Sequence, residues 1–319
     1  MEFVISSIHS KKEINEKYDV VVLGGGIAGI SASIYLKRYA INSLLISSEI
    51  GGLIKDAHRI ENYPGFSSIT GQELSSNFEK QLNYLGVEKL IDDVVEINFN
   101  ENEEYKIELK TKNNKTIKSK YLIYALGSKR KRLSIPNEEK YYGKGLSYCF
   151  TCDGAFFKDK IVSVIGGGDA ALTGALYLSD IAKKVFLIHR RKEFRAEDMW
   201  IKKAKEKSNI EFILEDEVKE IVGNDSVEKI NLKSGKKVEL NGIFIEIGNI
   251  PNTLLLKNTN VEFDDKGFVI VDSSQKTSNE YIYAAGDLTN ASQHFEQLVT
   301  SASEGAICVH SIQKQLNKN

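Results

Sequence analysis

Apolar and polar positions follow the same order near the start of the chain and again in its second half. A β-branched apolar run from Tyr18 to Leu23 leads into a glycine-rich stretch at 24–29. Apolar residues then recur at helical spacing, and a second apolar run covers 43–46. The pattern predicts a strand, a tight turn, a helix and a returning strand.

The glycines of this turn have separate tasks in a dinucleotide-binding unit. Gly24 bends the chain, Gly26 lets a pyrophosphate approach the backbone, and Gly29 brings the helix against the strand. The helix N-terminus, beside Ala28, favours phosphate charge. Glu49 follows the returning strand, near where an acid would hold ribose hydroxyls, although an exposed loop acid is the alternative.

The unit recurs with a strand over 160–165, a turn at 166–169, a helix over 170–178 and a returning strand over 184–188. Ala171 takes the position of the third glycine. We therefore expect a second dinucleotide site here. Its expected contacts at the turn are Gly166, Gly168, Asp169 and Ala170.

A basic block follows this second returning strand. It contains His189, Arg190 and Arg191, with Arg195 shortly after. Guanidinium groups offer paired donors to a phosphate, whereas a carboxylate at this corner would repel it. The block favours NADP(H) over NAD(H), and a solvated basic loop is the alternative.

A further short apolar run, 281–285, ends at Gly286 and Asp287, a turn that can present a carboxylate to a sugar hydroxyl. Two dinucleotide folds in one chain indicate a flavin that exchanges electrons with a nicotinamide.

Two cysteines lie between the predicted units. Cys149 and Cys152 are spaced to close a small loop or to share one helical turn. A disulfide over so few residues can open and re-form, and Asp153 beside it can move the proton. A buried, inert reduced pair is one alternative. Structural zinc is another, but it needs four ligands, and the histidines at 9, 58, 189, 294 and 310 are isolated. No metal is expected.

Cys308, in an apolar helical stretch, is expected to be a small core residue.

Length and charge narrow the class of protein. A chain of 319 residues favours two domains. A net charge of -1 gives no reason to expect nucleic acid or an anionic membrane as partner. No apolar stretch approaches the ~18 residues of a membrane-spanning helix, and the N-terminal run is too short for a signal peptide. We expect a cytoplasmic protein.

The order of these motifs resembles that of low-molecular-weight thioredoxin reductases from about Tyr18 to the C-terminus. The matching segments are 24–29, 61–65, 149–154, 166–171, 189–196, 248–253 and 284–287. The resemblance implies an α/β fold of two Rossmann-like dinucleotide-binding domains. An NADPH domain at 129–250, with the Cys pair, would be inserted into a discontinuous FAD domain at 1–128 and 251–319. It also implies a homodimer.

The resemblance assigns further roles. Asp153 falls on the proton donor, and the basic block falls on the NADPH phosphate contacts. The residues it adds to the FAD site are Gly51, Gly52, Asn62, Gly127, Asp287 and Gln297.

Five positions depart from the family pattern. Leu53 stands where a flavin-contacting Gln is usual, and Leu126 replaces a Thr. Glu296 replaces an Arg before Gln297, and Thr173 and Gly174 stand where a pair of Glu is common.

The function implied is electron transfer from NADPH through FAD and the Cys pair to the disulfide of a thioredoxin-like or glutaredoxin-like protein. Linkers near 128–132 and 247–252 would form a hinge between the domains. An alternative is a flavin-dependent dithiol oxidase, or a reductase with another donor or acceptor. A non-catalytic dinucleotide sensor is a third reading, because fold alone does not fix function.

Overall fold

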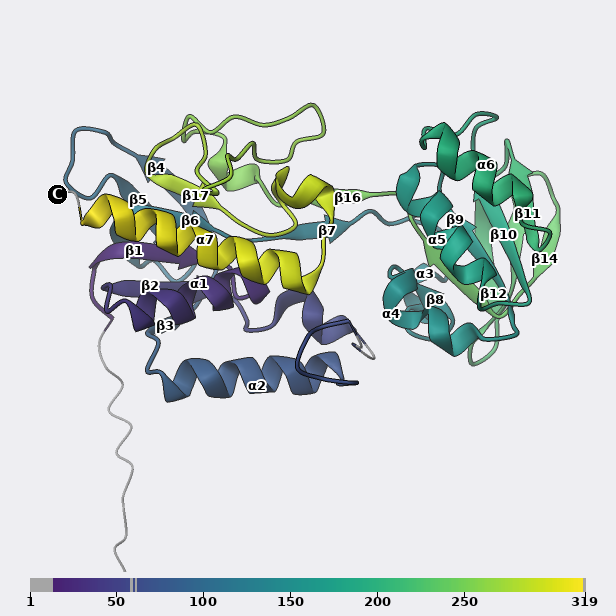
Figure 1. Ribbon diagram of the computed structural model, residues 1–319, viewed down its shortest axis with the longest axis horizontal. Helices are drawn as coiled ribbons and strands as arrows, with labels where there is room; N and C mark the ends of the chain where they lie inside the picture. The colour runs from purple at the N-terminus through teal and green to yellow at the C-terminus, as the bar shows by residue number, and fades with distance from the viewer. Residues whose placement is uncertain (1–13, 58–59, 61, 318–319) are drawn as a thin grey trace, which may run out of the picture. The chain divides into compact units, whose positions relative to one another are not determined.

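The computed structural model describes residues 14–57, 60 and 62–317 (Figure 1). The N-terminal run, His9, His58 and Glu61 lie outside the described residues. The chain divides into two compact units: residues up to 54, 75–127 and from 251 onwards form the first, and 55–74 with 128–250 form the second. The first unit is therefore discontinuous in sequence. Segment 55–74 groups with the second unit, whereas the domain limits expected from the sequence assign it to the FAD-binding part.

The first unit is built on a seven-stranded sheet. In spatial order its strands are β3 (Lys89–Ile91), β2 (Ser43–Ser47), β1 (Lys17–Leu23), β6 (Thr116–Tyr124), β5 (Ile107–Thr111) and β4 (Val94–Phe99), with β17 (Ile282–Ala284) also beside β6. β1 runs parallel to both β2 and β6, and β17 is parallel to β6. Tyr18, Leu23 and Tyr124 are fully or almost fully buried in its core. The carboxyl ends of the parallel strands therefore meet at one edge, where ligands bind in such sheets.

Two long helices of this unit pack closely, as Figure 1 shows for α1 (Ile27–Arg38) and α7 (Leu298–Leu316). The Ser31 hydroxyl donates to the Ala302 carbonyl at 2.6 Å. A Cβ added to Gly305 would lie 2.1 Å from the Ala28 carbonyl oxygen, so only glycine allows this approach. Among the described residues, four more helices precede β3 or follow residue 251 in the chain: α2 (Gly71–Tyr84), η1 (Gly52–Asp56), η3 (Leu254–Leu256) and η4 (Ala291–His294).

The second unit has a parallel five-stranded sheet and a smaller antiparallel one. The first has the order β11 (Ile210–Leu214), β10 (Lys184–His189), β9 (Ile161–Ile165), β15 (Gly242–Ile245) and β8 (Leu146–Ser147). The second has the order β12 (Val218–Gly223), β13 (Val227–Leu232) and β14 (Lys237–Glu239). The helices are α3 (Glu138–Tyr141), α4 (Phe150–Asp153), η2 (Gly154–Phe157), α5 (Asp169–Ser179) and α6 (Asp198–Glu206).

Alternate side chains of β10 enter different cores. Val185 and Leu187 pack with α5 and α6, which cover one face of the sheet (Figure 1). Phe186 and Ile188 pack with the small antiparallel sheet on the other face. A strand buried on both faces has a continuous apolar sequence. This is why apolar and polar residues do not alternate along the run that predicts β10.

The two linkers pair with each other as β7 (Ser128–Arg130) and β16 (Asn249–Pro251). The Asn252 amide side chain donates to the Leu126 carbonyl at 2.9 Å. The predicted hinge segments thus contain a two-stranded ribbon, and the hinge itself stays a prediction.

The predicted α/β class with a Rossmann-like sheet in each unit is confirmed. In the part of the chain that the structure describes, no helix has the length and apolar character needed to cross a bilayer.

Candidate active site

The first glycine turn lies at the carboxyl edge of the first sheet. Gly24 has φ +117°, and a Cβ there would lie 2.2 Å from the Ala125 carbonyl oxygen at the end of β6. A Cβ on Gly29 would lie 1.9 Å from the Gly24 carbonyl oxygen. Nothing lies within 4 Å of a Cβ added to Gly26. The turn therefore packs tightly on its protein side and leaves space at Gly26, as a phosphate cradle requires.

The chain after β2 lies against this turn. The Ser47 hydroxyl accepts from the Gly25 N–H at 2.8 Å and donates to the Glu49 carbonyl at 2.7 Å. The Gly51 N–H donates to the Gly25 carbonyl at 2.7 Å. A Cβ on Gly52 would lie 3.5 Å from the Gly26 Cα. The predicted residues at 49–52 are thus brought to the glycine turn. Ser47 is not among the residues predicted from sequence, and its signal there is a polar residue at the end of an apolar strand.

The turn after β17 reaches the same place. A Cβ on Gly286 would lie 3.2 Å from the Ala28 Cβ, and the Asp287 carboxylate accepts from the Ser301 hydroxyl at 3.1 Å. Asp287 therefore lies close to the N-terminus of α1, as a sugar-binding carboxylate should.

A buried carboxyl group lies beneath this turn. The Glu304 side chain is 5% exposed and accepts from the Gly286 N–H at 2.7 Å and from the Ser292 hydroxyl at 2.6 Å. Burial raises the pKa of Glu304, and the charge of Asp287 acts in the same direction. Glu304 is not among the residues predicted from sequence, and its signal there is an acidic residue on the apolar face of a helix.

The remaining predicted FAD contacts are more scattered. Gly127 follows β6, and its carbonyl accepts from the Asn252 N–H at 3.0 Å. Gln297 precedes α7, where its N–H donates to the Thr300 hydroxyl at 3.2 Å. Asn62 is exposed in the bend between Ile60 and Ile69, within the segment that groups with the second unit, and its contact with FAD stays a prediction.

The second glycine turn is bound to the basic loop that follows β10. The Arg195 N–H donates to the Gly167 carbonyl at 2.7 Å. The Asp169 carboxylate accepts from the Glu197 N–H at 2.8 Å. A Cβ on Gly166 would lie 2.8 Å from the Ala171 Cβ, so this alanine serves where the first unit has its third glycine. Gly168 has open space, as Gly26 does.

His189 differs from its arginine neighbours. It is 6% exposed, and its ring stacks on Phe194 at 5.3 Å between centroids. A Cβ on Gly167 would lie 2.1 Å from the ring. Burial lowers the pKa of His189, and the nearby arginine charges act in the same direction. The ring packs between Gly167 and Phe194 and so holds the loop in place.

The three arginines supply the positive charge of this loop. Arg190, Arg191 and Arg195 are exposed, and a pocket of about 340 Å³ is lined by residues 191–195. The cationic part of the predicted phosphate site is thus accessible to a ligand.

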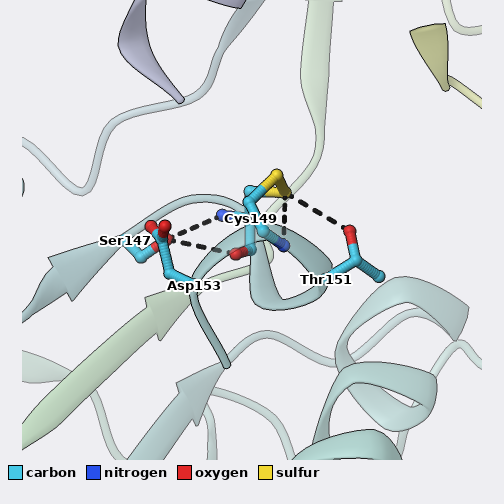
Figure 2. Close-up of a disulfide and its surroundings, with 5 residues drawn as sticks. Ser147, Cys149, Thr151 and Asp153 are labelled. Atoms are coloured by element: carbon cyan, nitrogen blue, oxygen red, sulfur yellow. Dashed lines mark hydrogen bonds between the residues drawn. A yellow bond between two sulfur atoms is a disulfide. The ribbon is translucent and has the colours of Figure 1, made fainter. Parts of the chain in front are cut away.

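The predicted cysteine pair forms a disulfide (Figure 2). The Cα atoms of Cys149 and Cys152 lie 5.3 Å apart, and the Cys152 N–H donates to the Cys149 sulfur at 3.2 Å. The Ser147 hydroxyl donates to the Asp153 carboxylate at 2.6 Å, and Thr151 lies on the other side of the turn. Both cysteines are half-buried and joined as a disulfide, which differs from the alternative of a buried reduced pair. Within the described ranges, no three His, Cys, Asp or Glu residues are placed to hold a metal ion.

Phe150, between the two cysteines, accounts for one departure from the family pattern. A Cβ on Gly174 would lie 2.8 Å from the Phe150 ring, which also contacts Tyr177 at 5.7 Å between centroids. No Glu fits at position 174 while Phe150 keeps this place. Cys308 is fully buried, so its predicted place in the core is confirmed.

Comparison with known proteins agrees with this geometry. The pyridine nucleotide-disulphide oxidoreductase family pattern matches residues 18–305. Thioredoxin reductase of Mycoplasma pneumoniae is 37% identical, over 94% of this chain and 95% of that protein. Thioredoxin reductase of Bacillus subtilis is 35% identical, over 93% and 94% respectively. The crystal structure of thioredoxin reductase from Streptococcus pyogenes has a TM-score of 0.85 at 34% identity, covering 96% of this chain and 100% of that one. The chain therefore belongs to the pyridine nucleotide-disulphide oxidoreductase family.

Proposed function

We propose that this protein is a thioredoxin-disulfide reductase that uses FAD and NADPH and acts through the Cys149–Cys152 disulfide. The observation that carries the proposal is the half-buried disulfide beside Asp153, in the same unit as the glycine turn and arginine loop of a nucleotide site. The similarity to thioredoxin reductases along more than nine-tenths of the chain supports the choice of acceptor.

The residues of the first unit fit FAD. The space at Gly26 and the N-terminus of α1 suit its pyrophosphate, and the carboxylates of Glu49 and Asp287 suit its sugar and ribityl hydroxyls. Bound FAD supplies the two-electron chemistry that links a nicotinamide to a disulfide. The protein's own part is to hold it and to keep its ring system oriented.

The second unit fits NADPH. Arg190, Arg191 and Arg195 can donate to the 2′-phosphate, and the open space at Gly168 lets a pyrophosphate approach the backbone. His189 and Asp169 hold the arginine loop against the turn.

The reduced cysteine pair exchanges with the disulfide of thioredoxin or of a glutaredoxin-like protein. One enzyme thiolate attacks a sulfur of that disulfide, forming a mixed disulfide and releasing one thiolate. The second enzyme thiol loses its proton and attacks the enzyme sulfur of the mixed disulfide. The Cys149–Cys152 bond re-forms and the second thiolate leaves. Two electrons have then passed to the acceptor. Its two departing thiolates take up one proton from the second enzyme thiol, carried by Asp153, and one from solvent.

The remaining assignments belong to the same proposal. The FAD-binding part comprises 1–128 and 251–319, and the NADPH-binding part comprises 129–250. The protein is a cytoplasmic homodimer with no nucleic-acid or membrane partner. Sedimentation equilibrium of the purified protein measures the assembly directly, and a monomer would contradict that part.

The test is anaerobic reduction of the purified yellow protein by NADPH and separately by NADH, followed by flavin absorbance. We expect NADPH to bleach the flavin faster than NADH does, and oxidised thioredoxin to restore the colour. Bleaching that only oxygen reverses would identify a dithiol oxidase instead. No bleaching by either nucleotide would leave the dinucleotide sensor as the better account.

A further inference from the structure

Ser147 has no role in the function proposed above, yet its side chain occupies a fixed place beside the disulfide. It is the last residue of β8, and Phe244 of β15 is its register partner in the parallel sheet. The side chain is 4% exposed. A hydroxyl group buried this deeply must form hydrogen bonds inside the protein or lose free energy.

The hydrogen bonds of Ser147 join the two ends of the segment that carries the cysteine pair, Cys149 and Asp153. The Ser147 hydroxyl accepts from the Cys149 N–H at 3.0 Å and donates to the Asp153 carboxylate at 2.6 Å. The Cys149 carbonyl lies 3.3 Å from the same hydroxyl, a weaker alternative acceptor. Figure 2 shows the Asp153 and Ser147 side chains turned toward each other on one side of the turn.

We propose that Ser147 is a positioning residue that holds the Asp153 carboxylate in place for proton transfer at the Cys149–Cys152 pair. The inference rests on the proposed function of Asp153. A hydrogen bond to an ionised carboxylate favours its charged form, and a fixed donor also fixes which oxygen is engaged. Ser147 thereby sets both the orientation of the carboxylate and its readiness to take up a proton.

The proton balance of the exchange shows where this acts. When the reduced pair attacks a disulfide, each enzyme sulfur must lose a proton before it forms its new S–S bond. The Asp153 carboxylate accepts that proton from the enzyme thiol and passes it on to the departing thiolate. Without Ser147 the carboxylate loses a donor, binds a proton more readily and is ionised over a narrower pH range.

The test follows exchange without nucleotide or thioredoxin. The full-length protein is reduced with dithiothreitol, freed of excess reductant anaerobically, and mixed with 5,5′-dithiobis(2-nitrobenzoate) across a range of pH. We expect Ser147→Ala to slow the reaction about tenfold near neutral pH, the size of one hydrogen bond to a charged group. The acid limb of its rate profile should move to higher pH. Ser147→Thr, which keeps the hydroxyl, should restore most of the rate.

Two further variants separate positioning from general damage. Ser163→Ala removes another fully buried hydroxyl, from β9 of the same sheet, which has no hydrogen-bond partner among the described residues. This variant should leave rate and profile unchanged. In an Asp153→Asn background, Ser147→Ala should have no additional effect.

An equal effect of Ser147→Ala with and without Asp153, or a slower rate with an unmoved pH profile, would overturn the inference. Because the assay uses neither NADPH nor thioredoxin, its outcome can be read even if the proposed function fails. In that event the nucleotide experiments would be negative while the dependence on Ser147 remained.

Discussion

At the scale of single residues, Phe150 and Gly174 form a matched pair. Gly174 lies inside α5, where alanine is usually favoured over glycine by about 1 kcal/mol. The Phe150 ring occupies the space that a side chain at 174 would need. Overpacking of this kind costs about 1–3 kcal/mol.

We therefore expect the sign of one substitution to depend on the other residue. Gly174→Ala should lower the thermal midpoint of the protein when Phe150 is present and raise it in a Phe150→Ala background. Thermal unfolding of the four proteins checks this. The same direction of change in both backgrounds would show that the Phe150 contact does not determine how Gly174→Ala changes the thermal midpoint.

Glu304 gives a pH dependence whose sign can be worked out. Its folded-state pKa is raised, so the folded protein binds the proton more tightly than the unfolded chain does. The stability from this group is fully present below the ordinary carboxyl pKa of about 4.3 and is lost as pH rises through the raised value. Glu304→Gln does not titrate. The variant should therefore become more stable relative to the native protein as pH rises above the ordinary carboxyl pKa of about 4.3.

Thermal midpoints of both proteins at several pH values measure the difference. Glu262→Gln, at an exposed position of the same unit, is the control and should give a constant difference. A constant difference for Glu304→Gln as well would contradict the assignment of a raised pKa.

Some site residues could be predicted from sequence because their signal is local. The glycine turns, the cysteine pair and the arginines each depend on spacing within a short segment. Ser47, Ser147 and Glu304 could not be found in this way, because a buried serine or glutamate has no sequence mark of its hydrogen-bond partner. Glu304 reaches Gly286 only because α7 packs beside α1.

At the scale of elements, different residues of the loop after β10 and its neighbours carry the positive charge and hold the loop in place. The exposed arginines supply the cations, whereas His189 and Asp169 bind the loop to the glycine turn. A hydrogen-bonded guanidinium contributes about 1.5–3 kcal/mol to phosphate binding.

We expect Arg190→Ala combined with Arg195→Ala to lower kcat/KM for NADPH by at least about a hundredfold and to leave kcat/KM for NADH nearly unchanged. Lys202→Ala, an exposed cation on α6, is the matched control. Steady-state kinetics with both nucleotides measure the effect. An equal loss with NADH would mean that the loop holds something other than the 2′-phosphate.

Buried parallel strands could be predicted closely from the sequence. The run at 18–23 corresponds to β1 at 17–23, and the run at 184–188 corresponds to β10 at 184–189. Glycine turns mark where these strands end. The pairing of β7 with β16 could not be predicted, because the two strands lie far apart in the chain and are only three residues long.

At the scale of the whole molecule, the proposed reaction needs the nucleotide and the disulfide to meet the flavin in turn. The linkers are the segments that would bend during such a motion. Gly127 and Gly248, at their ends, have φ +61° and +95°. A few residues of this kind are enough to absorb a domain rotation.

A crosslink engineered between the two units, away from both sites, should therefore abolish steady-state turnover while leaving flavin content and NADPH binding intact. The same cysteine variant without crosslinking is the control. Full turnover by the crosslinked protein would exclude a domain motion as part of the reaction.

The proposed function requires electrons to leave NADPH and to reach a protein disulfide through Cys149 and Cys152. The most direct measurement is anaerobic stoichiometry: NADPH oxidised against thiols formed on oxidised thioredoxin, for the native protein and for Cys152→Ser. We expect two thiols for each NADPH in the native protein and none in the variant. Thiol formation by Cys152→Ser, or NADPH oxidation with no thiols formed, would contradict it.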